Sequence, residues 1–361
     1  MTRLFRLCWL LLIAASAYGQ QSEFASLAGR VLDDSTSTPL SNVNIYIANT
    51  TLGGNTDERG TFEIRNIPLG THDIIASRIG YSLLTVRVSL QEARTRRLEF
   101  RLKPMNVEMG EVVVSAPDPA AWREELWRFT DYFLGITENS KECRITNPEV
   151  LDFTSSGHDA LEATARKPVE IDNLALGYHL TFFLKSFSIK GDIIAYEGLP
   201  KFSELIPKDS IQRKVWKENR MSAFDGSLRH FLISLYHSRI AKDGYALFHL
   251  DFLPLDQSVT SRKLVTEDEI LADGPLPGQK TLRFSGYLEV EHQGDMERGY
   301  NLLRKAGTTG QVSWLALNYY AVGFNERGLI NEAFPTRAYG YWAWRRVADM
   351  LPLDFVPQKG D

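Results

Sequence analysis

The sequence predicts a mainly β protein with an α+β part. We expect an N-terminal seven-stranded-type β-sandwich, followed by an α+β domain with a mainly antiparallel sheet. Between residues 25 and 104, short apolar segments are separated by turn-forming residues at regular intervals, which is typical of a β-sandwich. From residue 120 to residue 357, strand-like segments alternate with helical ones, which favours an α+β arrangement.

Residues 1–19 have the pattern of a cleaved signal peptide. Arg3 and Arg6 precede an apolar run that ends at Ala15, and the small residues Ala17 and Gly19 follow it. The run is too short for a membrane span, which needs about 20 apolar residues. We expect cleavage after Gly19, with Ala17 as the alternative, and therefore export to the periplasm, the outer membrane or the cell surface.

The charge of the mature chain argues against nucleic acid as a partner. Removing Arg3 and Arg6 from 41 basic residues leaves 39, against 45 acidic residues, which gives a net charge of −6. After signal removal, we expect no transmembrane helix. Cys143 is then the single cysteine, so stability must come from a buried core rather than from an intrachain disulfide.

The segment 25–104 is expected to form strands joined by tight turns. Its expected strands are 27–32, 43–47, 61–64, 73–77, 83–88 and 97–102. Phe62 and Ile64 are expected to point inward. Asp57 and Gly60 bracket a tight turn, because Asp bonds to turn amides and Gly tolerates a positive φ.

The motifs of this segment resemble the carboxypeptidase regulatory-like family. The resemblance rests on Gly29-Arg-Val, Asn42-Val-Asn-Ile, Thr56-Asp-Glu-Arg-Gly-Thr-Phe and Ile79-Gly-Tyr81. It implies a transthyretin-like β-sandwich of the kind found in exported proteins of Gram-negative bacteria. It also implies a folding and docking module with no catalytic residues of its own.

Residues 105–119 are expected to be a linker or a closing edge strand, because two prolines end a stretch without periodicity. Within it, Glu111-Val-Val-Val-Ser-Ala resembles the segment that joins this domain to the plug of TonB-dependent receptors. There such a segment can add to the sheet edge of a partner. The remaining chain contains helices and is too short for a plug and a barrel, so we do not expect a receptor of that kind.

The region 120–357 carries clear helical and strand patterns. An apolar stripe of Trp122, Leu126, Phe129 and Phe133 predicts a helix, and segments 178–189 and 193–197 predict a hairpin. Further helices are expected from Pro207, from Ser227 and over 341–350, and further strands are expected over 245–252, 281–290 and 312–322. The motifs Leu176-Gly-Tyr178, Tyr196-Glu-Gly-Leu-Pro-Lys-Phe202 and Asn219-Arg-Met-Ser-Ala-Phe-Asp-Gly-Ser227 resemble the uncharacterised extension of many regulatory-like-domain proteins. This resemblance supports an intact two-domain chain and brings no known activity with it.

No motif in the sequence predicts a catalytic site, a metal site or a cofactor. The histidines lack zinc-protease spacing, and His230 and His237 share a helix face without an evident third ligand. The cluster of Ser155, His158 and Asp159 is interpreted as a polar turn, because hydrolytic triads are assembled in space. Cys143 is interpreted as a small buried residue.

Aromatic residues gather late in the chain and offer weak ligand-binding candidates, namely Trp314, Tyr319, Tyr341 and Trp344. A hydrophobic core explains them as well. The leading functional hypothesis is a non-enzymatic binding or docking role toward an envelope protein or glycan. The alternatives are a hydrolase of peptides or glycans, favoured by a pocket with His158 or His230 beside a carboxylate, and an accessory subunit of a TonB-dependent outer-membrane transporter.

Overall fold

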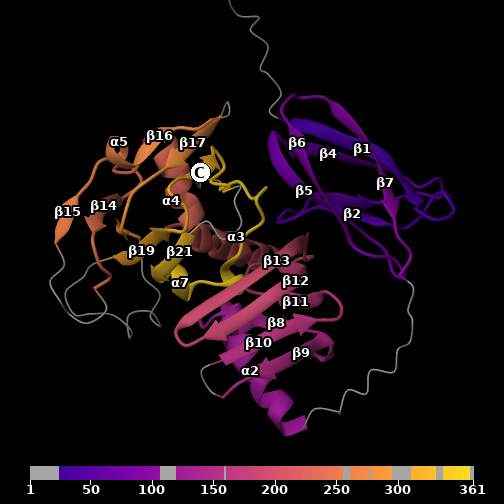
Figure 1. Cartoon of the computed structure of the whole chain (residues 1–361), viewed down its shortest axis with the longest axis horizontal. Helices are drawn as coiled ribbons and strands as arrows, with labels where there is room; N and C mark the ends of the chain where they lie inside the picture. The colour runs from indigo at the N-terminus through magenta and orange to yellow at the C-terminus, as the bar shows by residue number, and fades with distance from the viewer. Residues whose placement is uncertain are drawn as a thin grey trace, which may run out of the picture. The chain divides into compact units, whose positions relative to one another are not determined.

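The computed structural model describes residues 24–105, 119–157, 160–254, 261–275, 278–294, 310–330 and 336–357 (Figure 1). It divides into two compact units, the first of residues 1–48 and 52–108 and the second of residues 49–51 and 109–361. The expected signal peptide and the segment from Glu111 to Ala116 lie outside the described residues. Within the described part, no helix has the length and apolar character needed to cross a bilayer.

The first unit is a β-sandwich with a three-stranded and a four-stranded sheet, which confirms the seven-stranded-type prediction. The three-stranded sheet has the order β4 (Thr61–Pro68), β1 (Phe24–Asp33) and β7 (Thr95–Leu102). The four-stranded sheet has the order β3 (Gly53–Asn55), β2 (Asn44–Ile47), β5 (Gly70–Ser77) and β6 (Leu84–Leu90). Strands β1 and β7 are parallel, and the other pairs in the two sheets are antiparallel.

Buried apolar and exposed polar side chains alternate along the strands, and the buried ones form the core of the sandwich, as expected for half-buried strands. Phe62 and Ile64 are buried, and the ring of Phe62 stacks on that of Phe100 at 5.5 Å between centroids. The Asp57 carboxylate accepts hydrogen bonds from the amides of Arg59 and Thr61, which closes the turn before β4. The inward positions and the turn that the sequence predicts are therefore both present.

The second unit begins with a helix packed on a six-stranded antiparallel sheet. The elements are α2 (Pro119–Leu134), β8 (Cys143–Ile145), β9 (Leu151–Ser155), β10 (Ala160–Ala165), β11 (Val169–Asn173), β12 (Tyr178–Lys190) and β13 (Ile193–Glu204). The sheet has the order β8, β11, β12, β10, β9, and β13 also pairs with β12. Two one-turn 3-10 helices, Asn139–Glu142 and Pro148–Val150, flank β8. Phe129 and Phe133 of α2 are fully buried against the sheet, as their spacing predicts.

Two helices connect this sheet to a second β region. They are α3 (Ser210–Phe224) and α4 (Leu228–Tyr236). The β region has a five-stranded sheet of β15 (Arg262–Leu264), β14 (Tyr245–Leu250), β18 (Tyr287–His292), β19 (Gln311–Leu317) and β21 (Thr336–Gly340). It also has a three-stranded sheet of β16 (Leu271–Asp273), β17 (Gln279–Leu282) and β20 (Val322–Asn325). The short helices are α5 (Glu267–Ile270), α7 (Tyr341–Trp344) and the 3-10 turn Val347–Asp349.

Several boundaries differ from the sequence prediction. Pro207 lies before α3 rather than in its first turn, because Asp209 caps the helix by accepting a hydrogen bond from the Gln212 amide at 2.7 Å. The strand expected over 281–290 is two strands, β17 and β18, and the strand expected over 312–322 ends at Leu317. Ser227 caps α4 as predicted, with its hydroxyl accepting from the His230 amide.

Candidate functional site

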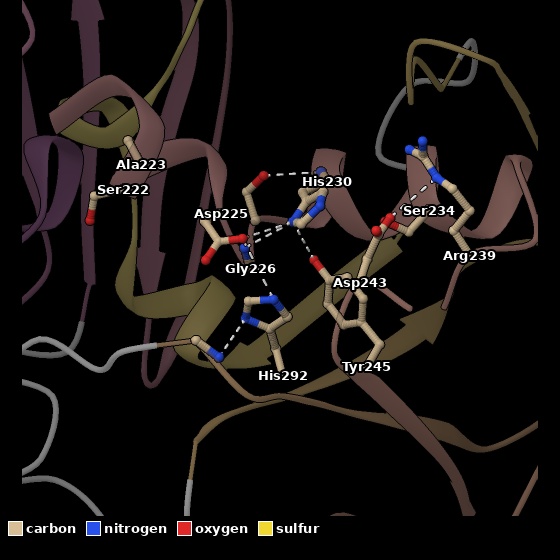
Figure 2. A network of polar contacts seen from close by, with 12 residues as sticks. Ser222, Ala223, Asp225, Gly226, His230, Ser234, Arg239, Asp243, Tyr245 and His292 are labelled. Atoms are coloured by element: carbon tan, nitrogen blue, oxygen red, sulfur yellow. Dashed lines mark hydrogen bonds and ion pairs between the residues drawn. The ribbon is translucent and has the colours of Figure 1, made fainter. Parts of the chain in front are cut away.

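A partly buried polar cluster in the second unit brings together Asp225, His230 and His292 (Figure 2). Asp225 is the C-cap residue that follows α3, His230 lies in the first turn of α4, and His292 is the last residue of β18. The register of the five-stranded sheet places Tyr245 of β14 directly opposite His292. Gly226 and Ser227 connect α3 to α4, and this turn directs the His230 side chain toward Asp225 and His292.

The distances within this cluster are short enough for direct interaction. Asp225 Oδ1 lies 3.3 Å from His230 Nδ1 and 3.6 Å from His292 Nε2. His230 Nδ1 also lies 2.9 Å from the Tyr245 hydroxyl and accepts a hydrogen bond from the Gly226 amide at 3.2 Å. The rings of Tyr245 and His292 are 4.4 Å apart. The cluster is therefore built by packing as well as by polar contacts.

Burial keeps the two imidazoles neutral at neutral pH. It lowers the pKa of His230, and the nearby Asp225 carboxylate opposes this effect. Burial likewise lowers the pKa of His292, again against Asp225. Burial raises the pKa of Tyr245 well above its usual value, so its phenol stays protonated and donates to His230 Nδ1. Neutral imidazoles beside a carboxylate can accept a proton or coordinate a cation.

Neighbouring contacts fix the loop that precedes Tyr245. Ser234 of α4 donates a hydrogen bond to the Asp243 carboxylate at 2.8 Å, and Arg239 pairs with the same carboxylate at 3.3 Å. Figure 2 shows these contacts beside the cluster. Because Ser234 and Arg239 both bind the Asp243 carboxylate, they restrain the loop before β14 and therefore the position of the Tyr245 ring.

The sequence predicts that His230 shares a helix face with His237, whereas in the structure other residues surround His230. His237 is exposed and caps the far end of α4. Asp225 and His292 are the neighbours of His230 instead. The proximity of Asp225 could have been inferred from the sequence, because only the Gly226-Ser227 cap separates it from the helix of His230. His292 could not, because the pairing of β14 with β18 brings it there.

The other reactive residues considered from the sequence lie elsewhere. His158 and Asp159 lie outside the described residues, and Ser155 is an exposed residue at the end of β9. Cys143 is partly buried, and its thiol donates to the Asn139 carbonyl at 3.3 Å. Burial raises the pKa of this thiol to about 12, with Asp349 and Glu142 adding to the effect. Cys143 is therefore a protonated thiol at neutral pH.

The four aromatic candidates have different environments. Tyr341 and Trp344 of α7 are buried, at 0% and 7% exposure. Trp314 of β19 is partly buried, and its indole donates to the buried carboxylate of Glu289 at 2.8 Å. Tyr319 is 51% exposed. Of these four, Tyr319 presents the most surface to a ligand, and ligand binding by the group stays a prediction.

A groove beside α3 exposes apolar side chains in the second unit. It has a volume of about 460 Å³, and Ile211, Val215 and Trp216 of α3 line it together with Leu174. Trp216 forms the buried floor and donates to the Leu174 carbonyl at 2.7 Å, whereas Ile211 is 73% exposed. The charged lining residues are Glu138, Glu142, Lys208 and Asp209, three acidic and one basic. The groove therefore combines an apolar surface with an acidic rim.

A second charged cluster lies on the six-stranded sheet. His179 of β12 contacts Glu170 at 2.9 Å through Nε2 and Asp172 at 2.8 Å through Nδ1. Both carboxylates come from β11, which pairs with β12. The hydrogen bond with Glu170 raises the pKa of His179 to about 9, against partial burial and with help from Asp172. His179 is therefore a doubly protonated cation at neutral pH.

We expect this ion cluster to stabilise the fold in a pH-dependent way. Because the folded pKa of His179 is above its unfolded value of 6.5, the stabilisation is complete below pH 6.5 and is lost as pH rises through about 9. After allowance for solvent screening at these half-buried groups, the stabilisation is about 1–2 kcal/mol.

NMR titration of His179 measures the pKa directly, and Glu170→Gln is expected to lower the pKa of His179 toward 6.5. Glu162→Gln on neighbouring β10 is the matched control and is expected to leave it unchanged. A wild-type His179 that titrates near 6.5 contradicts the prediction.

Taken together, the first unit defines an N-terminal β-sandwich module and the second an α+β unit with a polar cluster and a groove. The sandwich is a carboxypeptidase regulatory-like domain, because residues 27–114 match the model of the CarboxypepD_reg-like domain. That match ends at residue 114, before α2 begins.

Comparison with solved structures gives only partial similarities. The pilus 2b backbone protein of group B streptococcus is 16% identical with a TM-score of 0.20, over 23% of this chain and 42% of that one. The minor pilin of Streptococcus agalactiae is 14% identical with a TM-score of 0.21, over 24% and 46%. The 3-chlorocatechol 1,2-dioxygenase of Rhodococcus opacus is 17% identical with a TM-score of 0.20, over 24% and 62%. The aligned regions span less than two thirds of each of these structures and carry no argument about function. No curated protein matches the sequence.

Proposed function

We propose that this chain is an exported cell-envelope protein with a binding role, in which the sandwich is a docking module and the second unit binds a partner protein. The leader pattern of residues 1–19 supports export, and the regulatory-like domain supports a docking role for the first unit. The observation that carries the binding role is the groove beside α3, because it leaves apolar side chains in contact with solvent.

The chemistry of the groove favours a protein segment over a glycan. Leu174 and Val215 are 51% and 43% exposed, and Ile211 projects even more of its surface. A partner that covers such side chains gains about 25 cal/mol for each Å² of apolar surface buried. The rim carries three carboxylates and one lysine, and Glu138 already pairs with Lys141 at 2.6 Å. The excess of negative charge on the rim favours a partner that carries lysine or arginine beside its apolar residues. We therefore propose a basic, apolar segment of an envelope protein as the occupant.

The test is reversible crosslinking in intact cells that express the tagged full chain, followed by capture and identification of partners. Ile211→Glu places a charge in the groove, and we expect it to reduce capture of the specific partner at least about tenfold, which corresponds to roughly 1.4 kcal/mol. Ile206 is 94% exposed and is not among the residues that line the groove. Ile206→Glu is therefore the matched control and is expected to capture the partner as wild type does.

Three results would contradict the proposal. The first is a partner captured equally by the wild type and by Ile211→Glu, because the groove would then not be its binding surface. The second is capture of no specific partner by any of the three proteins. A loss of capture with both isoleucine variants would also count against the groove, since the control residue lies outside it.

A further inference from the structure

We propose that Asp225, His230 and His292 form a binding site for a divalent transition-metal cation of the zinc class. The proposal does not depend on the binding function proposed above. One side-chain ligand atom from each of the three residues lies within 4.8 Å of the other two. The three residues come from two helix termini and a strand end, so the fold and not local sequence brings them together.

The spacing of the donor atoms fits a tetrahedral ion. Ligand atoms that bind zinc at about 2.0–2.1 Å lie about 3.3 Å from one another in a tetrahedral site. Asp225 Oδ1 lies 3.3 Å from His230 Nδ1 and 3.6 Å from His292 Nε2. The ligand atoms of the two histidines lie within 4.8 Å of each other. Asp225 is therefore already at ligand spacing from both histidines, and the two imidazoles close toward the cation when it binds.

The donor types select the class of metal. Two imidazole nitrogens and one carboxylate oxygen suit zinc and its neighbours in the first transition row, whereas calcium and magnesium require mostly oxygen donors. Three protein ligands also leave a fourth position for water or substrate, as in zinc sites that take part in reactions. The Asp225 side chain is 50% exposed, so this position has access to solvent.

The site is held in shape before any ion binds. His292 is 6% exposed and packs against the Tyr245 ring on one side. Backbone encloses its ring on other sides, because a Cβ added to Gly294 would lie 2.6 Å from its Cε1 and one added to Gly226 would lie 2.8 Å from its Nδ1. The backbone carbonyl of Asp225 accepts a hydrogen bond from Arg345 at 3.1 Å. Such packing limits the cost of ordering the ligands.

Metal binding at His292 requires one local change. Its Nδ1 accepts a hydrogen bond from the Gly294 amide at 3.1 Å, so the ring proton is on Nε2, which faces Asp225. A bound cation takes the place of this proton, which moves to Nδ1, and the Gly294 amide turns away from the ring. His230 needs no change in its ring proton, because its Nδ1 is already an acceptor for the Gly226 amide and the Tyr245 hydroxyl. A cation at this nitrogen takes over its lone pair, so these two hydrogen bonds are lost when the metal binds.

Titration of the purified full chain with Zn²⁺ by calorimetry tests the proposal, with Co²⁺ absorption as a report on tetrahedral geometry. We expect one equivalent to bind at this site. Since loss of a residue that merely supports a metal ligand weakens binding by about 10–100-fold, we expect His292→Ala and Asp225→Asn to weaken it by about 100-fold or more. Asp225→Asn preserves size at a half-exposed position, so it keeps the test valid if His292→Ala disturbs folding.

His237→Ala is the matched control, because His237 is exposed and lies at the other end of α4 from His230. It is expected to bind zinc as the wild type does. Absence of stoichiometric binding by the wild type overturns the proposal, and so does equal binding by the wild type and Asp225→Asn. Loss of binding in His237→Ala would assign the metal to a different set of histidines and would also overturn it.

Discussion

Replacing Phe133 with alanine is expected to lower the free energy of unfolding of the second unit by about 3–5 kcal/mol. Phe133 is fully buried at the contact between α2 and the six-stranded sheet. Its ring packs edge-on against Phe182 at 5.0 Å and Tyr196 at 5.5 Å. Removal of the ring leaves a cavity that these neighbours, which are held in strands β12 and β13, cannot fill.

Chemical denaturation measures this effect, with Trp127→Ala on the same helix as the control. Trp127 is 66% exposed, so its loss is expected to change stability by no more than about 0.5 kcal/mol. The comparison separates burial from helix propensity, because both changes place alanine in α2. A Phe133→Ala protein as stable as the wild type would contradict the packing of α2 on the sheet.

The second large effect is expected from Arg229→Ala, with a loss of about 2–4 kcal/mol in the stability of the second unit. Arg229 of α4 donates to the carbonyls of Pro352 at 3.0 Å, Leu353 at 2.7 Å and Phe355 at 3.3 Å. It also donates to the carbonyl of Arg327 at 3.1 Å. Burial, with Arg327 nearby, lowers the pKa of Arg229 to about 10 against the opposing charge of Asp354, and the guanidinium remains charged at neutral pH.

Hydrogen exchange at residues 352–355 tests this role together with denaturation. Loss of the guanidinium is expected to speed exchange in this segment, because its carbonyls lose their donors. Arg229→Lys keeps the charge but not the planar fork of donors, so we expect it to restore only part of the stability. Full stability in Arg229→Ala, or unchanged exchange in 352–355, would contradict the arrangement.

The sandwich was predictable because its strands follow local rules. Phe62 and Ile64 alternate with exposed residues, and Asp57 and Gly60 mark the turn before them. The third strand, Gly53–Asn55, is not among the strands that the sequence predicts, because its glycines carry no apolar pattern. Its pairing with β2 makes it a strand, and that pairing is a tertiary contact.

In the second unit, local pattern predicted the longer helices and strands, but it missed short strands such as β8, β15 and β16 and did not fix the ends of the elements it predicted. Tyr319 and Tyr320 look like strand residues in the sequence, yet they lie in a turn and are 51% and 89% exposed. Aromatic side chains favour strands only where a neighbouring surface covers them. The expected helix over 341–350 is a short helix at Tyr341–Trp344 and a separate 3-10 turn, with an extended Arg345 between them.

The polar cluster could not be predicted from sequence because its residues meet through the sheet register. Tyr245 lies opposite His292 only because β14 pairs with β18 in that register. The groove beside α3 depends in the same way on Leu174, which comes from the turn between β11 and β12. Spacing along the chain predicts one helix face at a time, whereas both sites join residues from several elements.

The measurement that tests the binding role most directly is photo-crosslinking in intact cells from a photoreactive residue at position 215, inside the groove. Val215 lines the groove and is 43% exposed, so a reactive group there would touch any occupant. We expect one dominant crosslinked envelope protein from position 215, and none of that protein from a photoreactive residue at position 206. No crosslink from position 215, or the same product from both positions, would contradict partner binding in the groove.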